Sequence, residues 1–223
     1  QGALEAMRRT EGLGAASDIL SLDETMVATQ IVRLWIAQGN LEAAGRWAPA
    51  CGLNADGEWS AEPHPYVARE SVILGLTRVL MARGDTLQAL RLLDSLLLEA
   101  QQLKRTTVVI EVLVLQALAR QTLGDTDAAL RHLERALLLA EPEGFVRVYL
   151  NEGAPMARLL CEAASHNICP DYVNHLLAAF EAEKVRSHAS PPSCPSAPLE
   201  LLTPRGRDVL DLIFFVFGIS CDA

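Results

Sequence analysis

Aromatic side chains and lysines are scarce in this sequence, and each shortage excludes a class of protein. Aromatic residues make up 5% of the 223 residues. Residues with branched β-carbons form no long alternating runs, so the pattern of a β-sheet is missing. The chain has only two lysines, Lys104 and Lys184, and a formal net charge of −9. Because an acidic chain releases few phosphate counterions, a nucleic-acid-binding surface over most of its length is not expected.

Paired cysteines and long apolar runs are also missing. The five cysteines are scattered and no Cys-x-x-Cys occurs. We therefore expect reduced thiols in a cytoplasmic protein rather than a disulfide framework or a zinc ribbon. The sequence contains no signal peptide and no long apolar span, so we expect no membrane segment. It starts with Gln1 rather than Met, and we expect a fragment of a longer protein.

A turn signature recurs in the first two thirds of the chain. Corner glycines at Gly39, Gly84 and Gly124 are each followed by Asn or Asp and, five residues after the glycine, by Ala. Glycine suits the left-handed backbone at a helix end, and Asn or Asp can cap the next helix. The small Ala lets two antiparallel helices approach closely. The spacings of 45 and 40 residues predict successive helical hairpins.

Leucines at helical spacing flank each corner and predict a helix on either side of it. The expected helices are residues 24–38, 41–51, 66–83, 86–103, 106–123 and 126–140. A single hairpin leaves an apolar face exposed, and stacking on a neighbour buries that face. We therefore predict an all-α fold, a right-handed superhelical array of antiparallel helical hairpins with extra C-terminal helices.

The extra helices are expected at residues 145–150, 154–166 and 171–185, where they would cap the stack. Residues 187–198 hold four prolines and four serines and predict an exposed linker. The predicted domains are residues 1–186 for the repeat array, 187–198 for the linker and 199–223 for a C-terminal remnant.

The turn signature and the hairpin period resemble tetratricopeptide repeats, although the period of ~40 residues exceeds the classical ~34. Residues 105–153, together with 90–105 and 153–160, look like the sensor domain of large MalT-like, LuxR-type transcription regulators. The resemblance extends to about Phe180. It implies an array that binds a small-molecule inducer, or a protein or peptide, on its concave face. ATP is implied only for an N-terminal module that is missing here, so no cofactor is expected in this chain.

A second resemblance follows the linker. Residues 202–213 are similar to the opening helix of the LuxR-type helix-turn-helix, with Thr203 as a cap and Arg205 and Arg207 in the DNA-binding remnant. Gly206 departs from the acidic residue usual in that motif. The resemblance stops at Phe214, before any recognition helix. We expect a truncation within the DNA-binding domain, so that DNA would be bound only through the missing part.

No local motif predicts catalysis or metal binding. His166, Cys169 and His175 lie within ten residues of one another, but their spacing fits no common zinc pattern. No nucleophile and base stand at a recognisable spacing, so we expect neither an enzyme nor a metal site. An enzyme, as an alternative, would need a pocket with converging titratable groups.

The candidate binding residues follow from the repeat register. In tetratricopeptide arrays the first helix of each pair lines the concave groove, which places positions three, six and thirteen before each corner glycine inward. The polar residues selected in this way are Arg33, Arg78, Ser71, Glu111 and Gln121. Two arginines at equivalent positions would suit a carboxylate or phosphate group on a ligand. The alternative is that both are ordinary solvated residues or are paired within a repeat.

The leading interpretation is the ligand- or partner-sensing region of a MalT-like regulator of transcription. A stand-alone tetratricopeptide adaptor for protein–protein interaction stays open as the alternative. The helix-turn-helix remnant after the linker argues against the adaptor.

Overall fold

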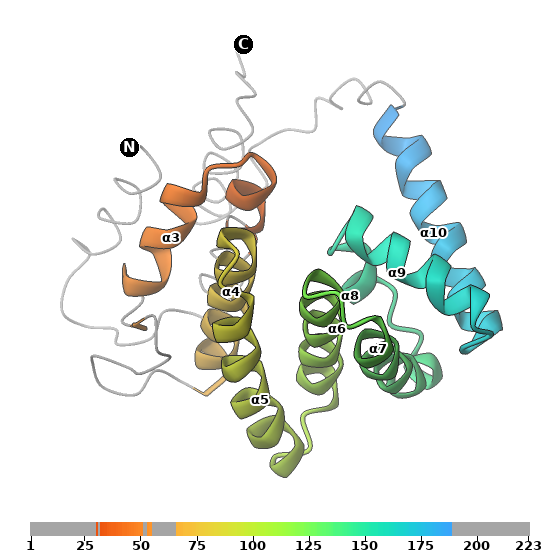
Figure 1. Ribbon diagram of the computed structural model, residues 1–223, viewed down its shortest axis with the longest axis horizontal. Coiled ribbons are helices and arrows are strands. Elements are labelled where there is room, and N and C mark those ends of the chain that lie inside the picture. Colours follow the sequence, from red (N-terminus) through yellow and green to blue (C-terminus); the bar gives the residue numbers. More distant parts are fainter. Residues whose placement is uncertain (1–29, 31, 51–52, 55–65, 189–223) are drawn as a thin grey trace, which may run out of the picture. The chain divides into compact units, whose positions relative to one another are not determined.

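The computed structural model describes residues 30, 32–50, 53–54 and 66–188, all within one compact unit, Ser21–Ala189. Residues 66–188 contain only helices and the turns that join them, which confirms the all-α prediction (Figure 1). The start of the first expected helix, most of the predicted linker, and Thr203, Arg205 and Arg207 lie outside the described residues.

Four consecutive helix pairs and one further helix make up the described fold. Residues 32–37 are helical and form the first pair with α3. The bounds of the named elements are α3 (Leu41–Ala50), α4 (Tyr66–Arg83), α5 (Thr86–Gln102), α6 (Thr106–Thr122), α7 (Thr126–Ala140), η1 (Glu141–Glu143), α8 (Arg147–Leu150), α9 (Ala154–Ser165) and α10 (Pro170–His188). The second pair is α4 with α5, the third α6 with α7, and the fourth α8 with α9.

The helix bounds of the repeat region follow the sequence closely, and the differences lie towards the C-terminus. Helices α4 and α7 have the predicted bounds, whereas α8 begins two residues later than expected. Helix α10 begins at Pro170, because proline is well tolerated in a first helical turn. It continues to His188 and so includes the first two residues assigned to the linker. The first linker proline is Pro191, so no proline interrupts α10 before its end at His188.

The three predicted corners are tight bends that close the preceding helix. At the second corner, Gly84 has φ +91°, its N–H donates to Met81 O at 3.1 Å, and Asp85 N–H donates to Leu80 O at 2.9 Å. Equivalent pairs of bonds occur at the other two corners and define the Schellman motif. Side-chain caps occur at Asn40 and Asp125, but Asp85 makes none, contrary to expectation. Its backbone carbonyl accepts the first helical bonds instead.

The same bend occurs at two further connections, which lack glycine. Lys104, with φ +54°, lies between α5 and α6, and Asn167, with φ +57°, lies between α9 and α10. The bonds Arg105 N–H to Ala100 O and Ile168 N–H to Ala163 O complete the motif. Asparagine visits the left-handed region readily, and lysine does so rarely.

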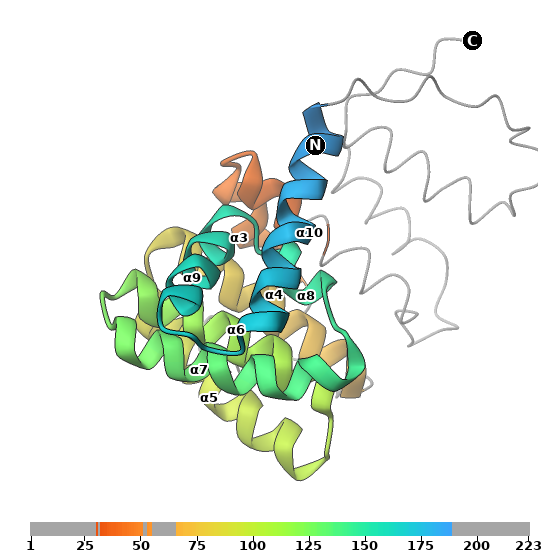
Figure 2. The same cartoon turned by 90° about the vertical axis from the view of Figure 1, so that its right-hand side faces the viewer.

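Helix α6 is the centre of the described core. It contacts α4, α5, α7, α8 and α9, and residues 108–119 are all buried except Glu111. Helices α9 and α10 lie side by side beyond it (Figure 2). In the first two pairs, Trp47 of α3 is 2% exposed and its ring faces Gly75 of α4. Because α6 contacts α4 of the second pair and α8 and α9 of the fourth, its residue Glu111 lies between these two pairs.

Candidate functional site

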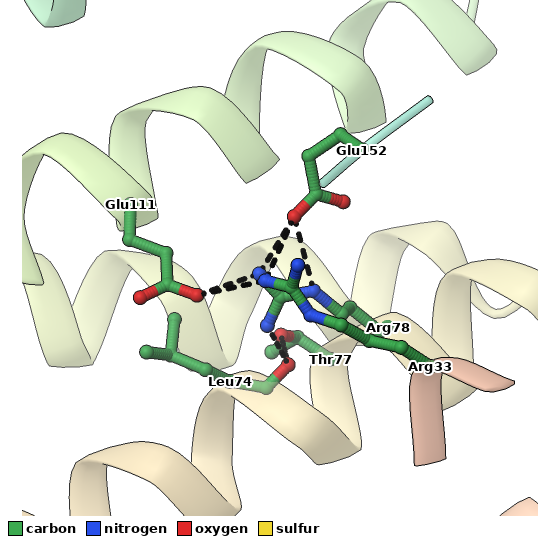
Figure 3. Close-up of polar contacts among 6 residues, drawn as sticks. All are labelled: Arg33, Leu74, Thr77, Arg78, Glu111 and Glu152. Atoms are coloured by element: carbon green, nitrogen blue, oxygen red, sulfur yellow. Dashed lines mark hydrogen bonds and ion pairs between the residues drawn. The ribbon is translucent and has the colours of Figure 1, made fainter. Parts of the chain in front are cut away.

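Four charged side chains from four different helix pairs meet on the side of the first helices (Figure 3). Arg33 belongs to the helix at residues 32–37, Arg78 to α4 and Glu111 to α6. Glu152 lies in the turn between α8 and α9. We call these four residues the arginine–glutamate cluster.

Arg78 holds both carboxylates with short contacts. Its Nη2 lies 2.7 Å from Oε1 of Glu111 and 2.7 Å from Oε1 of Glu152. Its Nε donates to the same Oε1 of Glu152 at 3.2 Å, and its Nη1 donates to the backbone oxygen of Leu74 at 3.1 Å. All three guanidinium nitrogens of Arg78 are therefore hydrogen-bonded.

Arg33 touches the same two carboxylate oxygens through one nitrogen. Its Nη2 lies 3.2 Å from Oε1 of Glu111 and 3.1 Å from Oε1 of Glu152. The Nε and Nη1 atoms of Arg33 are buried and find no hydrogen-bond partner among the described residues. The two arginines are equivalent in the repeat register but unequal in their bonding.

Burial and charge act differently on the two arginines. Arg78 is 6% exposed, and burial lowers its pKa, but the charges of Glu152 and Glu111 outweigh burial and raise the pKa above its usual value. The pKa of Arg33 is lowered, first by burial and then by the like charge of Arg78. Both guanidinium groups stay protonated at neutral pH. The cluster is formally neutral, with two positive and two negative charges.

The last turn of the site depends on a glycine. Glu152 immediately precedes Gly153, whose φ of +68° and ψ of −150° lie in a region that essentially only glycine occupies. Gly153 also ends the short helix α8 and caps α9, because its carbonyl accepts the N–H groups of Met156 and Ala157. This turn brings the Glu152 carboxylate to a contact with Arg33, 119 residues earlier in the chain.

The structure brings together three of the five residues that the register selected, namely Arg33, Arg78 and Glu111. The arginines are neither solvated nor paired within a repeat, because both bind carboxylates from other helix pairs. Gln121 lies elsewhere and its Nε2 donates to Oε2 of Glu162, which joins α6 to α9.

Two residues mark where the register reasoning was incomplete. Ser71 is half-buried on α4, outside the arginine–glutamate cluster. Glu152 was not foreseen. The signal available for it was Gly153 directly before a proline-containing helix start, which marks a fourth corner only 29 residues after Gly124.

The segment from His166 to His175 shows ring packing. Tyr172 stacks on His175 with ring centroids 6.5 Å apart, and its hydroxyl donates to the backbone oxygen of Phe145. Over the described residues, no group of three or more His, Cys, Asp or Glu side chains is placed to hold a metal ion. None of the helices that the structure describes combines the length and apolar composition needed to cross a membrane.

A family model described as MalT-like TPR region matches residues 1–166. A search of curated proteins and a search of solved structures each found no match.

Proposed function

The chain belongs to the family of MalT-like TPR regions, and on this premise we propose that it senses a ligand or partner for a LuxR-type regulator of transcription. The observation that carries the proposal is the family match over residues 1–166. In the whole regulator, DNA would be bound by the helix-turn-helix whose opening helix residues 202–213 resemble. The proposal includes a cytoplasmic location and no catalytic role.

The surface proposed for binding is the one formed by the first helices of the pairs. The arginine–glutamate cluster lies on that side and pairs its own charges, so its part in the proposal is to join four helix pairs there rather than to contact the ligand. Buried charges that are paired contribute little net stability compared with apolar residues of similar size. Their presence here is therefore better explained by specificity of the arrangement than by stability alone. The occupant would be a small-molecule inducer, or a protein or peptide segment.

A thermal-shift screen of small metabolites and nucleotides against this chain tests the proposal. A ligand that binds only the folded state stabilises it by about 2.7 kcal/mol at a concentration of 100 times its Kd. For a domain of this size, that corresponds to a rise in Tm of roughly 5–11 °C. Calorimetry would then measure the affinity of each hit for the parent and for a Ser71→Ala variant, which changes one of the five candidate binding residues.

The regulator and the adaptor differ in what a ligand does next. In the full regulator, a confirmed ligand should change the affinity for promoter DNA in a gel shift, or the output of a transcription reporter. A ligand or peptide that binds the array and leaves both readouts unchanged would favour the stand-alone adaptor instead.

A further inference from the structure

The two arginines of the arginine–glutamate cluster differ in the number and length of the contacts that each would lose if its side chain moved out of the cluster. Arg78 bonds through three nitrogens, with contacts as short as 2.7 Å. Arg33 uses Nη2 alone, at 3.1 and 3.2 Å. If Arg33 left, Glu111 and Glu152 would both keep Arg78 as a partner. If Arg78 left, they would keep only the two longer contacts to Arg33.

Burial of Arg33 is incompletely compensated. Its side chain is 15% exposed, yet its Nε and Nη1 make no hydrogen bond within the described residues. Burying a hydrogen-bond donor without a partner costs free energy, which offsets part of what the two contacts of Nη2 contribute. The lowered pKa of Arg33 has the same origin in burial and in the neighbouring charge of Arg78. If this side chain moved into solvent, water could hydrogen-bond to its Nε and Nη1 groups.

The contacts of Arg33 also reach helix pairs that are not adjacent in the array, whereas repeats usually contact only their neighbours. They join the first helix pair to Glu111 of the third pair and to Glu152 of the fourth. In the part of the chain that the structure describes, these are the ion pairs that connect residues 32–37 to α6 and to the turn before α9. Arg78, in contrast, links the second pair to the third and fourth.

We propose that the arginine–glutamate cluster is a latch with a fixed and a releasable half. Arg78, Glu111 and Glu152 form the fixed half, which keeps the second, third and fourth pairs joined. Arg33 is the releasable arm, and its departure frees the first pair from the third and fourth while the rest of the array stays closed. The latch is a conformational device of the folded chain and does not depend on the proposed function.

Hydrogen exchange followed by mass spectrometry tests this division. The variant Arg33→Met keeps an apolar side chain and removes the charge. We expect exchange in residues 32–47 to rise roughly threefold to tenfold, the range that corresponds to the net contribution of one ordinary hydrogen bond. Exchange in α6 and in residues 147–160 should stay close to that of the parent. The variant Arg78→Met should raise exchange in all three regions.

Conservative replacements separate the two roles further. Because Arg33 acts through a single nitrogen, Arg33→Lys should restore most of the protection of residues 32–47. Arg78→Lys should not restore the parent pattern, because one ammonium group cannot replace three bonded nitrogens. Arg46→Ala is the matched control, because it removes an exposed arginine whose ion pair within the described residues is with Glu42 on its own helix; it should leave exchange unchanged.

Several outcomes would overturn the latch. Unchanged protection of residues 32–47 in Arg33→Met would show that Arg33 does not hold the first pair. An equal rise in α6 and residues 147–160, or global unfolding of Arg33→Met in circular dichroism, would show that Arg33 belongs to the fixed half. Failure of Arg33→Lys to restore protection would exclude a point-charge contact. None of these results bears on whether the array binds a ligand.

Discussion

Replacing Arg78 with methionine tests whether charge pairing holds the helix pairs together. Methionine keeps an apolar stem in the space of the arginine but removes the guanidinium group. Glu111 and Glu152 would then face each other with only the longer contacts to Arg33. Removing one partner of a buried ion pair costs about 3–5 kcal/mol. Because the Glu111 side chain is 25% exposed, solvent can relieve part of that penalty, and we expect about 3 kcal/mol.

Differential scanning calorimetry provides the measurement. For a domain of this size, 1 kcal/mol lowers Tm by about 2–4 °C, so Arg78→Met should melt roughly 6–12 °C below the parent. The double variant Arg78→Met with Glu152→Gln should lose less than the sum of the single variants, since the glutamine removes the charge left unpaired. A Tm of Arg78→Met within about 1 °C of the parent would refute the reasoning, because the two carboxylates would then be equally stable without their contacts to Arg78.

Two further predictions concern the packing of the array. Gly75→Ala should destabilise by about 1–3 kcal/mol in urea unfolding, because the added Cβ would lie 2.4 Å from Cζ3 of Trp47; a stabilised variant, the usual result for glycine to alanine within a helix, would contradict this contact. Burial, and secondarily Glu141, raises the pKa of Tyr172 to about 12, above the unfolded value of about 10. The neutral phenol is therefore favoured by folding, and the free energy of unfolding should fall as pH rises from about 10 to 12, with a smaller fall in Tyr172→Phe.

The helices and the three glycine corners were predictable because their signals are local. A glycine that ends a helix, a polar residue after it and leucines at helical spacing act within a few residues of one another. Lys104 and Asn167 adopt the same left-handed conformation without glycine. The left-handed backbone at these two bends was not predicted, because the sequence pattern was built on glycine: Asn167 is a weaker signal of the same kind, and Lys104 gives none. A left-handed lysine costs about 1–3 kcal/mol, and the two backbone hydrogen bonds of the bend, from Lys104 N–H to Gln101 O and from Arg105 N–H to Ala100 O, offset part of it.

The candidate site was predictable only as a face. Register arithmetic selects which side of a helix a residue occupies, and it placed Arg33, Arg78 and Glu111 together. It does not specify which carboxylate meets which arginine across 33 or 78 residues of chain. The register did not predict Glu152, because α8 has four residues and the fourth corner does not follow the 40-residue period. The handedness of the superhelix stays a prediction.

The reach of the arginine–glutamate cluster has a consequence for how the array unfolds. In a simple repeat array each unit contacts only its neighbours, and stability is close to a sum of units and nearest-neighbour interfaces. Arg33 contacts Glu111 and Glu152, which belong to the third and fourth pairs, and so adds coupling beyond the nearest neighbour. Coupling of this kind makes distant units melt together.

The positions of the tryptophans allow that coupling to be measured. All three tryptophans of the sequence precede residue 60, so their fluorescence reports on the N-terminal part and, through Trp47, on its contact with α4, whereas far-UV circular dichroism reports on all helices. In the parent, the two thermal transitions should coincide. In the double variant Arg33→Met with Arg78→Met, the fluorescence transition should occur several degrees below the dichroism transition, because the first pair then has only its nearest neighbour. Coincident transitions in this variant would mean that apolar contacts between adjacent pairs already account for the cooperativity, and that the charges contribute nothing to it.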